Sequence, residues 1–321
     1  MIKIKYRKAL KIFAFTLGIL FILTNVIIII QAYSLTHFTE KGEQLTHDYK
    51  PGLAEKVSIA LFGLKVPKPK VKNLPVVPYE TIFIEEDKGE KLEAWLLKTD
   101  SVKEGLVICF HGYMDEKSSM LDRAYIFLKM RYNVLLVDFM GAGGSYGYQS
   151  TMGFLEAKNV KTVYDYANNN MDEDKIILIG FSMGAAAIIK AQYEYDIHPI
   201  ALITEAPYGT FRGTVDKRLD TFNMPHWPIS YLFTFWTGKI NGFDAFSSNP
   251  EDYAKQITTP ILVMGGGKDQ NIPIVETERI YNAFTSKHKH LTIFPESSHE
   301  SYILKYPDEW ERTVDNFLNH Q

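Results

Sequence analysis

Short apolar runs alternate with amphipathic stretches along most of this chain. Runs at 81–85 and 92–98 flank the polar turn 87–90 and predict an opening β-hairpin. Six further apolar runs predict strands at 106–110, 133–137, 175–179, 200–204, 261–264 and 291–294. Helical periodicity separates most of these strands, at 118–130, 154–167, 183–192, 274–283 and 309–318. This alternation predicts an α/β fold with a mostly parallel sheet of about eight strands, covered by helices on both faces.

The pentapeptide GFSMG at 180–184 joins a predicted strand to the alanine-rich helix that follows it. Its two glycines allow strained dihedrals and close helix–strand packing, so the spacing predicts a sharp turn with Ser182 at its apex. Such a turn lifts the hydroxyl above the carboxyl edge of the sheet and points the N-terminus of the next helix at any anion formed there. An ordinary Gly/Ser turn is the alternative interpretation, because the G-x-S-x-G pattern also arises by chance.

A serine hydroxyl needs a base that accepts its proton and a third group that orients this base. In a sheet of this kind the chain order is serine, acid, histidine, each in a loop after a strand. Asp269 follows the predicted strand 261–264 and His299 follows 291–294, in that order. Taken singly, Asp269 could be a turn residue and His299 a surface loop residue. Glu205 is a rival acid, but the coincidence of order favours Asp269.

The dipeptide His111-Gly112 follows the predicted strand 106–110 and supplies a further check. We expect the backbone N–H of Tyr113 and that of Met183 to form an oxyanion hole at the same sheet edge. His111 is expected to brace this loop rather than to act as the base. The ring of Tyr113 either lines a substrate pocket or packs against the surface.

Together with DFMGAGGS at 138–145 and GGGKD at 265–269, these motifs resemble the α/β-hydrolase superfamily over roughly residues 80–318. More narrowly, they resemble its membrane-anchored or secreted esterase/lysophospholipase-like and serine-peptidase-like branch. The resemblance implies that Ser182 is the nucleophile, His299 the general base, Asp269 its orienter, and the Tyr113 and Met183 amides the oxyanion hole. The chain departs from the pattern at Met140, where such proteins often carry an arginine, so the usual anchoring charge of that loop is missing.

The N-terminal region predicts a membrane anchor. Basic residues within 1–11 precede 12–30, a run of nineteen residues without a charge. At about 1.5 Å per residue this run is close to the thickness of a bilayer's hydrocarbon core. An uncleaved signal anchor is preferred to a cleaved signal peptide, because no convincing small-x-small site follows at 31–33. The basic segment would stay in the cytosol and the domain at 79–321 would face outward, so the protein is expected to be a single-pass membrane protein.

Two other segments have distinct patterns. Residues 31–78 are expected to be a juxtamembrane segment and linker, with a short amphipathic helix at 54–64 and an extended proline-rich stretch at 66–75. Residues 206–256 interrupt the strand–helix rhythm for about fifty residues, which predicts a helical lid over Ser182. The lid is aromatic; its rings either line a site for an acyl chain or pack the lid onto the core. Its Arg212, Lys217 and Arg218 either meet an anionic headgroup or are solvated.

Composition narrows the function classes. The formal charge of −3 argues against a nucleic-acid partner, and the single cysteine, Cys109, leaves the redox compartment open. No His, Cys or carboxylate spacing indicates a metal site, so no cofactor is expected. We therefore predict a serine hydrolase that acts on small or lipid-like carboxylic esters. A peptidase or amidase, an acyltransferase and a non-catalytic acyl-binding protein remain as alternatives, and the natural substrate is left open.

Overall fold

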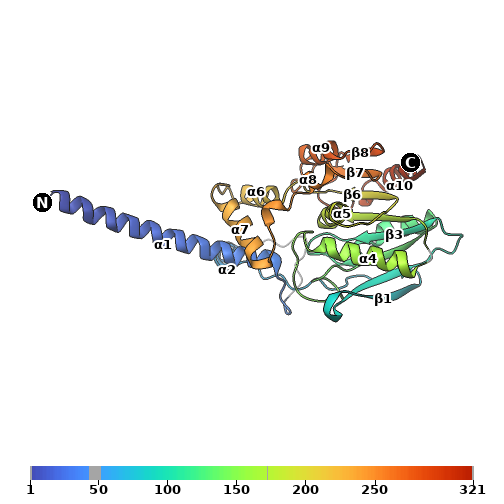
Figure 1. Ribbon diagram of the computed structural model, residues 1–321, viewed down its shortest axis with the longest axis horizontal. Coiled ribbons are helices and arrows are strands. Elements are labelled where there is room, and N and C mark those ends of the chain that lie inside the picture. Colours follow the sequence, from blue (N-terminus) through green and yellow to red (C-terminus); the bar gives the residue numbers. More distant parts are fainter. Residues whose placement is uncertain (1, 43–51, 172, 320–321) are drawn as a thin grey trace.

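The computed structural model describes residues 2–42, 52–171 and 173–319 and contains one eight-stranded sheet (Figure 1). The strand order is β1-β2-β4-β3-β5-β6-β7-β8. The strands are β1 Tyr79–Glu85, β2 Lys91–Leu97, β3 Gly105–Phe110, β4 Tyr132–Val137, β5 Ile176–Phe181, β6 Ala201–Glu205, β7 Ile261–Gly266 and β8 Lys289–Phe294. β2 pairs antiparallel with β1 and β4, and all other neighbours are parallel. The predicted α/β sheet and its opening hairpin are thus confirmed.

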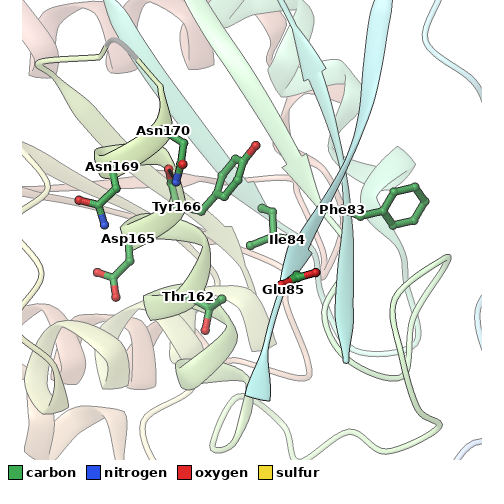
Figure 2. Close-up of a pocket in the computed structure, with 8 residues that line it drawn as sticks. All are labelled: Phe83, Ile84, Glu85, Thr162, Asp165, Tyr166, Asn169 and Asn170. Carbon is green, nitrogen blue, oxygen red and sulfur yellow. Dashed lines mark hydrogen bonds between the residues drawn. The ribbon is translucent and has the colours of Figure 1, made fainter. Parts of the chain in front are cut away.

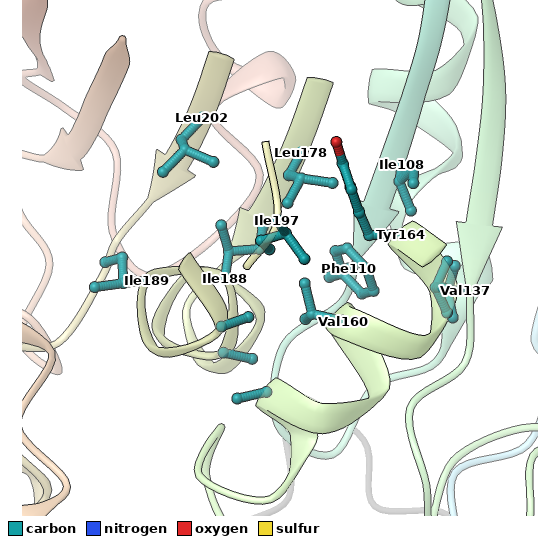
Figure 3. Packing of buried hydrophobic residues seen from close by; sticks show 14 of the residues in the cluster. Ile108, Phe110, Val137, Val160, Tyr164, Leu178, Ile188, Ile189, Ile197 and Leu202 are labelled. Carbon is teal, nitrogen blue, oxygen red and sulfur yellow. The ribbon is translucent and has the colours of Figure 1, made fainter. Parts of the chain in front are cut away.

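Helices cover both faces of the sheet. They are α3 Leu121–Lys129 (preceded by the 3₁₀ turn η2 Lys117–Met120), α4 Glu156–Asn170, α5 Met183–Glu194, α9 Ile274–Ala283 and α10 Pro307–Asn319. Alternate residues of β3 belong to different cores. Ile108 and Phe110 pack with α4 and α5 (Figure 3). Val107 and Cys109 pack with α3 and α10. Because successive side chains of a strand point to opposite faces, an entirely apolar strand of this kind requires helices on both sides.

The strand before the GFSMG motif is longer than predicted. β5 continues to Phe181, which pairs with Glu205 of β6, instead of ending at residue 179. The strand therefore runs directly into the turn, and the residue next to Ser182 is fixed by the sheet.

The N-terminal helix is also longer than the predicted span 12–30. Helix α1 covers Ile2–Thr36, and its part at Tyr6–Thr36 is long and apolar enough to cross a membrane; the mean hydropathy reaches 2.6 over a window of 18 residues. Helix α2, Leu53–Phe62, corresponds to the predicted amphipathic helix. Met1 of the predicted basic segment, residues 43–51 of the predicted juxtamembrane segment and residues 172 and 320–321 of the predicted hydrolase domain lie outside the described residues.

The proline-rich stretch at 66–75 is extended, as predicted, but it is not a free linker. Thr39 forms a β-bridge with Pro67, and the N–H of Gly143 donates to the carbonyl of Pro69 at 2.9 Å. Lys72 pairs with Asp115 at 2.9 Å. The chain here is therefore held along the loops of the domain.

The insertion at 206–256, called the lid below, is helical. It contains α6 Phe211–Thr221, α7 Ile229–Asn241, the 3₁₀ turn η3 Ala245–Ser247 and α8 Pro250–Ala254. α6 and α7 lie on the side of the domain from which α1 projects (Figure 1). Buried side chains of α1, α6 and α7 form one apolar cluster that is separate from the two cores of the sheet.

Candidate active site

Ser182 lies on a strained turn between β5 and α5. Its backbone has φ 52° and ψ −109°, and its N–H donates to the carbonyl of Glu205 at 2.7 Å. A Cβ atom at Gly184 would lie 2.3 Å from the carbonyl oxygen of Phe110, and one at Gly180 would lie 2.4 Å from Gly184. Both positions therefore need glycine, because a side chain would push α5 away from the end of β3 at Gly184 and away from β5 at Gly180. The strain holds the hydroxyl at the carboxyl edge of the sheet.

The three residues singled out by their chain order meet at this edge. His299 Nε2 lies 3.0 Å from Ser182 Oγ, and His299 Nδ1 lies 2.7 Å from Asp269 Oδ2. The other carboxylate oxygen of Asp269 accepts the N–H groups of Asn271 and Ile272, each at 2.8 Å. A carboxylate only accepts hydrogen bonds, so the imidazole proton lies on Nδ1 and Nε2 can accept the serine proton.

The rival acid Glu205 is engaged elsewhere. Its side chain is fully buried, forms an ion pair with the guanidinium of Arg123, and accepts the indole N–H of Trp310 at 2.8 Å. Phe181 stands between this pair and the site, since its ring lies 5.0 Å from the His299 ring and 5.5 Å from the Arg123 guanidinium carbon. Glu205 therefore supports the wall behind the histidine instead of contacting it.

The backbone amides of Tyr113 and Met183 follow β3 and the turn at Ser182. In the described part of the chain, no acceptor takes the N–H of either residue. Met183 is the first residue of α5, where helical N–H groups have no partner within the helix. Both amides are therefore available to an oxygen that develops negative charge beside Ser182.

His111 braces its loop. The buried ring accepts the N–H of Phe139 on Nε2 at 3.1 Å, and its Nδ1 lies 2.8 Å from the carbonyl of Gly112. These two contacts tie the loop after β3 to the loop after β4, with a proton on Nδ1. The ring does not contact Ser182, so its geometry fits the expected supporting role.

The charge missing at Met140 is supplied from another element. Lys117, at the start of η2, is fully buried and pairs with Asp138 and, at 2.7 Å, with Glu93. Asp138 also accepts the N–H groups of Lys117 and Gly144, at 2.7 and 3.0 Å. The loop is thus anchored by a lysine from the preceding segment.

The sequence analysis missed three buried charges that support the site, Lys117, Arg123 and Glu156, and it quoted their neighbour Asp138 only as part of a motif. The carboxylate of Glu156 accepts the N–H groups of Thr151 and Gly153 at 2.7 and 2.9 Å, in a loop that packs on Met183. A charged residue near a predicted helix end ordinarily indicates a solvated face, so only the burial of these side chains identifies them.

The ring of Tyr113 packs against α1. Its hydroxyl donates to the carbonyl of Leu35 at 2.6 Å, and its ring stacks on Phe38 with centroids 5.8 Å apart. Of the two alternatives for this residue, packing is the observed one. The last turn of α1 thus contacts the loop that carries one of the two available amides.

A surface hollow between β1 and α4 lies apart from Ser182. Figure 2 shows that its lining comes from β1 and α4 and is largely polar, with Glu85, Asp165, Asn169 and Asn170 among the residues. Its lining holds no nucleophile–base pair, unlike the cluster at Ser182. Among the described residues, no group of three His, Cys, Asp or Glu side chains is arranged to hold a metal ion.

Comparisons with known proteins agree with this fold. A family model described as serine aminopeptidase, S33, matches residues 101–230. The solved Pyrococcus furiosus esterase Pf2001 is 25% identical, with a TM-score of 0.64 over 78% of this chain and 96% of that chain. The chain has the α/β-hydrolase fold. The matches support hydrolase activity in general.

Two curated relatives extend this picture. The uncharacterized protein YqkD of Bacillus subtilis is 27% identical over 67% of this chain and 71% of its own length. A lysophosphatidylserine lipase, ABHD12 of Xenopus tropicalis, is 22% identical over 63% of this chain and 52% of its own length.

Proposed function

We propose that this protein is a membrane-anchored serine hydrolase that cleaves carboxylic esters through an acyl-enzyme intermediate. The observation that carries the proposal is the continuous hydrogen-bonded chain from Ser182 through His299 to Asp269, at 3.0 and 2.7 Å. A nucleophile, a base and an orienting carboxylate in this geometry are what acyl transfer at neutral pH requires.

Ser182 attacks the ester carbonyl while His299 Nε2 takes its proton. Asp269 holds the imidazole in the required tautomer and stabilises the imidazolium that forms. The N–H groups of Tyr113 and Met183 bind the oxyanion of the tetrahedral intermediate. The imidazolium then protonates the leaving alcohol; water, activated by the same histidine, releases the acid in the second step.

The substrate class follows from the surroundings of the site. A long apolar helix and an aromatic lid favour an ester with an acyl chain, such as a lysolipid or another lipid-like ester. The similarity to a protein named as a lysophosphatidylserine lipase supports the same class. With α1 as a signal anchor, the basic N-terminal segment faces the cytosol and the hydrolase domain faces outward. A reporter fused after the last residue should then be active only outside the cytosol, and cytosolic activity would contradict this orientation.

A peptidase or amidase is the second candidate, because the matching family model is described as a serine aminopeptidase. The same triad and amides would cleave an amide bond. An acyltransferase would share the first step and differ in excluding water from the second.

A fluorophosphonate probe tests the nucleophile. The wild-type protein should be labelled, Ser182→Ala should not, and the exposed-site control Ser101→Ala should be labelled like the wild type. Labelling of Ser182→Ala would refute the assignment.

A substrate panel then separates the candidate activities. p-Nitrophenyl esters of short and long chain and aminoacyl arylamides would be offered to the wild type and to Ser182→Ala. We expect Ser182-dependent ester hydrolysis that increases with chain length. Hydrolysis of the arylamides alone would assign the peptidase activity, and product formation only with an added acceptor alcohol would assign the transferase.

A further inference from the structure

Helix α1 has two parts with different surroundings. Its side chains from residue 6 to residue 24 are exposed, and this part projects away from the domain (Figure 1). From Asn25 onward one face is covered, and Ile28, Ala32 and Leu35 are buried at helical spacing against the lid. The proposed membrane span at 12–30 therefore overlaps the part that packs on the protein.

This overlap determines how far α7 lies inside the proposed membrane span. Trp236 Nε1 donates to Asn25 Oδ1 at 2.9 Å, and Phe233 packs in the same cluster as Ile28. At about 1.5 Å per residue, Asn25 lies about 7 Å inside the outer end of the span. Asn241, five residues further along α7, reaches Thr36 at 3.2 Å, so α7 runs in the same direction as α1. The start of α7 and the loop before it consequently lie deeper than Trp236.

Large apolar side chains are exposed at the deep end of the lid, beside the polar residues Asn223 and His226. Trp227 is 75% exposed, and it has exposed apolar neighbours on the α6–α7 loop and on α7: Phe222, Met224, Tyr231 and Phe235. Monomeric proteins in water rarely expose aromatic side chains in such number at one place. Tryptophan and tyrosine are enriched where a protein meets the interface of a bilayer.

Helix α2 also exposes apolar side chains and is also held by α1. It has no buried residue, and Leu53, Val57 and Leu61 form an exposed apolar stripe at i, i+4 and i+8. Gln31 of α1 donates to the carbonyls of α2 at Ile59 and Ala60, at 2.6 and 3.0 Å. At Gly63, where α2 ends, a Cβ atom would lie 2.6 Å from Ser34 of α1. A ten-residue helix is marginal in water, but an apolar surface can hold it.

We infer that the lipid bilayer covers both surfaces: the apolar stripe of α2 together with the α6–α7 loop and the first half of α7. These residues are called the membrane face below. The inference rests on α1 as the membrane anchor of the proposed function. It deepens that function, because a lid that is immersed beside its anchor admits an acyl ester directly from the membrane, without passage through water.

The bilayer is favoured over a protein partner because the membrane face is continuous with α1. The same helix that is proposed to cross the hydrocarbon core carries α7 on one side and α2 on another, through the contacts of Asn25 and Gln31. Whatever surrounds α1 at the level of Asn25 must therefore also surround the exposed side chains next to it.

Spin labels on the full chain test this placement. The single cysteine, Cys109, is buried, so a new surface cysteine can be labelled selectively. Labels at Trp227→Cys and Val57→Cys, in protein reconstituted in phosphatidylcholine vesicles, should be relaxed by oxygen and protected from a water-soluble nickel chelate. The label at Val102→Cys, an exposed residue before β3, should show the reverse. Nickel accessibility of the first two labels equal to that of Val102→Cys overturns the inference, and so does protection from both reagents, which indicates a protein partner.

A label at Phe15→Cys distinguishes a failure of the proposed anchor from a failure of the membrane face. If Phe15→Cys is in lipid while Trp227→Cys and Val57→Cys are in water, the anchor stands and the membrane face is refuted. If Phe15→Cys is in water, the proposed anchoring fails, and the membrane face fails with it. Hydrolysis of a soluble short-chain ester by every labelled variant verifies that the hydrolase domain is folded.

Activity provides an independent readout. The double variant Trp227→Ser/Val57→Ser should hydrolyse a long-chain ester embedded in vesicles roughly tenfold more slowly, because it loses apolar contact with the membrane. Its rate on a soluble short-chain ester should be unchanged. An equal loss on both substrates, or no loss on either, contradicts entry from the membrane.

Discussion

The change Asp269→Asn tests the proposed role of the histidine tautomer. In the structure, Asp269 Oδ1 accepts two backbone N–H groups, from Asn271 and Ile272, and Oδ2 faces His299. An asparagine keeps these two acceptor bonds only if its carbonyl oxygen occupies the Oδ1 position. Its NH₂ group then faces His299 Nδ1 and donates to it. The imidazole proton is forced onto Nε2 and points at Ser182. Nε2 then has no lone pair to accept the serine proton.

The structure also disfavours the side-chain flip that would restore the productive tautomer. Flipping the amide restores the productive tautomer but leaves two backbone N–H groups facing an NH₂ group, at a cost of about 1–3 kcal/mol each. The productive form is then disfavoured by about 2–6 kcal/mol, which corresponds to a loss of activity between about 30-fold and about 10⁴-fold. The upper figure equals the loss of about 10⁴ known for this substitution in a serine protease.

The assay is kcat/KM for a short p-nitrophenyl ester, measured beside thermal unfolding. The melting temperature of Asp269→Asn should stay close to that of the wild type, because both backbone contacts are kept. Asp308→Asn, an exposed aspartate at the start of α10, is the matched control and should retain full activity. If Asp269→Asn is folded and keeps more than a third of the wild-type activity, the reasoning from the tautomer is refuted.

Three further predictions concern the support of the site. Lys117→Met leaves the Asp138 carboxylate buried without its cation, so the unfolding free energy in urea should fall by about 3–5 kcal/mol, and adding Asp138→Asn should recover part of it. Burial raises the pKa of Glu276, whose stabilising contribution is thus present at low pH and lost as the pH rises through the folded-state pKa. Glu276→Gln should therefore melt above the wild type near about pH 8, with the difference vanishing near about pH 4; equal differences at both values would contradict this. A chain that starts at Asn25 should hydrolyse a soluble ester like the full protein, whereas one that starts at His37 should lose activity because the lid loses its packing on α1; equal activities would refute a structural role for this part of α1.

The positions of the triad residues were predictable because each follows an apolar strand. Parallel strands end at one edge of a sheet, so strand patterns and chain order are enough to bring Ser182, Asp269 and His299 into one region. The rest of the site depends on pairs that no local pattern reports. Arg123 and Glu205 are far apart in the chain and fully buried together. A hydrophobic pattern assigns such residues to the surface, because it contains no information about a partner.

The helical structure of the lid was predicted, but the burial of its aromatic side chains was not. The length of the interval and its composition indicated helices, and helices are present. Its aromatic residues divide into two groups that the sequence does not distinguish. Tyr208, Phe211 and Phe233 are buried, whereas Phe222 and Trp227 are exposed. Packing explains only the first group, so the two alternatives for these rings do not apply to the lid as a whole.

Helix α1 shows why an apolar run can have two functions at once. Apolar side chains on every face suit lipid and a protein core equally, so hydropathy cannot locate the boundary between them. Polar side chains can locate this boundary, because within a bilayer each of them needs a hydrogen-bond partner. In the outer part of α1, Asn25, Gln31 and Thr36 each contact α7 or α2. In the inner part, Thr16 bonds only to the carbonyl of Ile12 in its own helix. The polar residues that bond to α7 or α2 therefore mark where α1 becomes part of the packed protein.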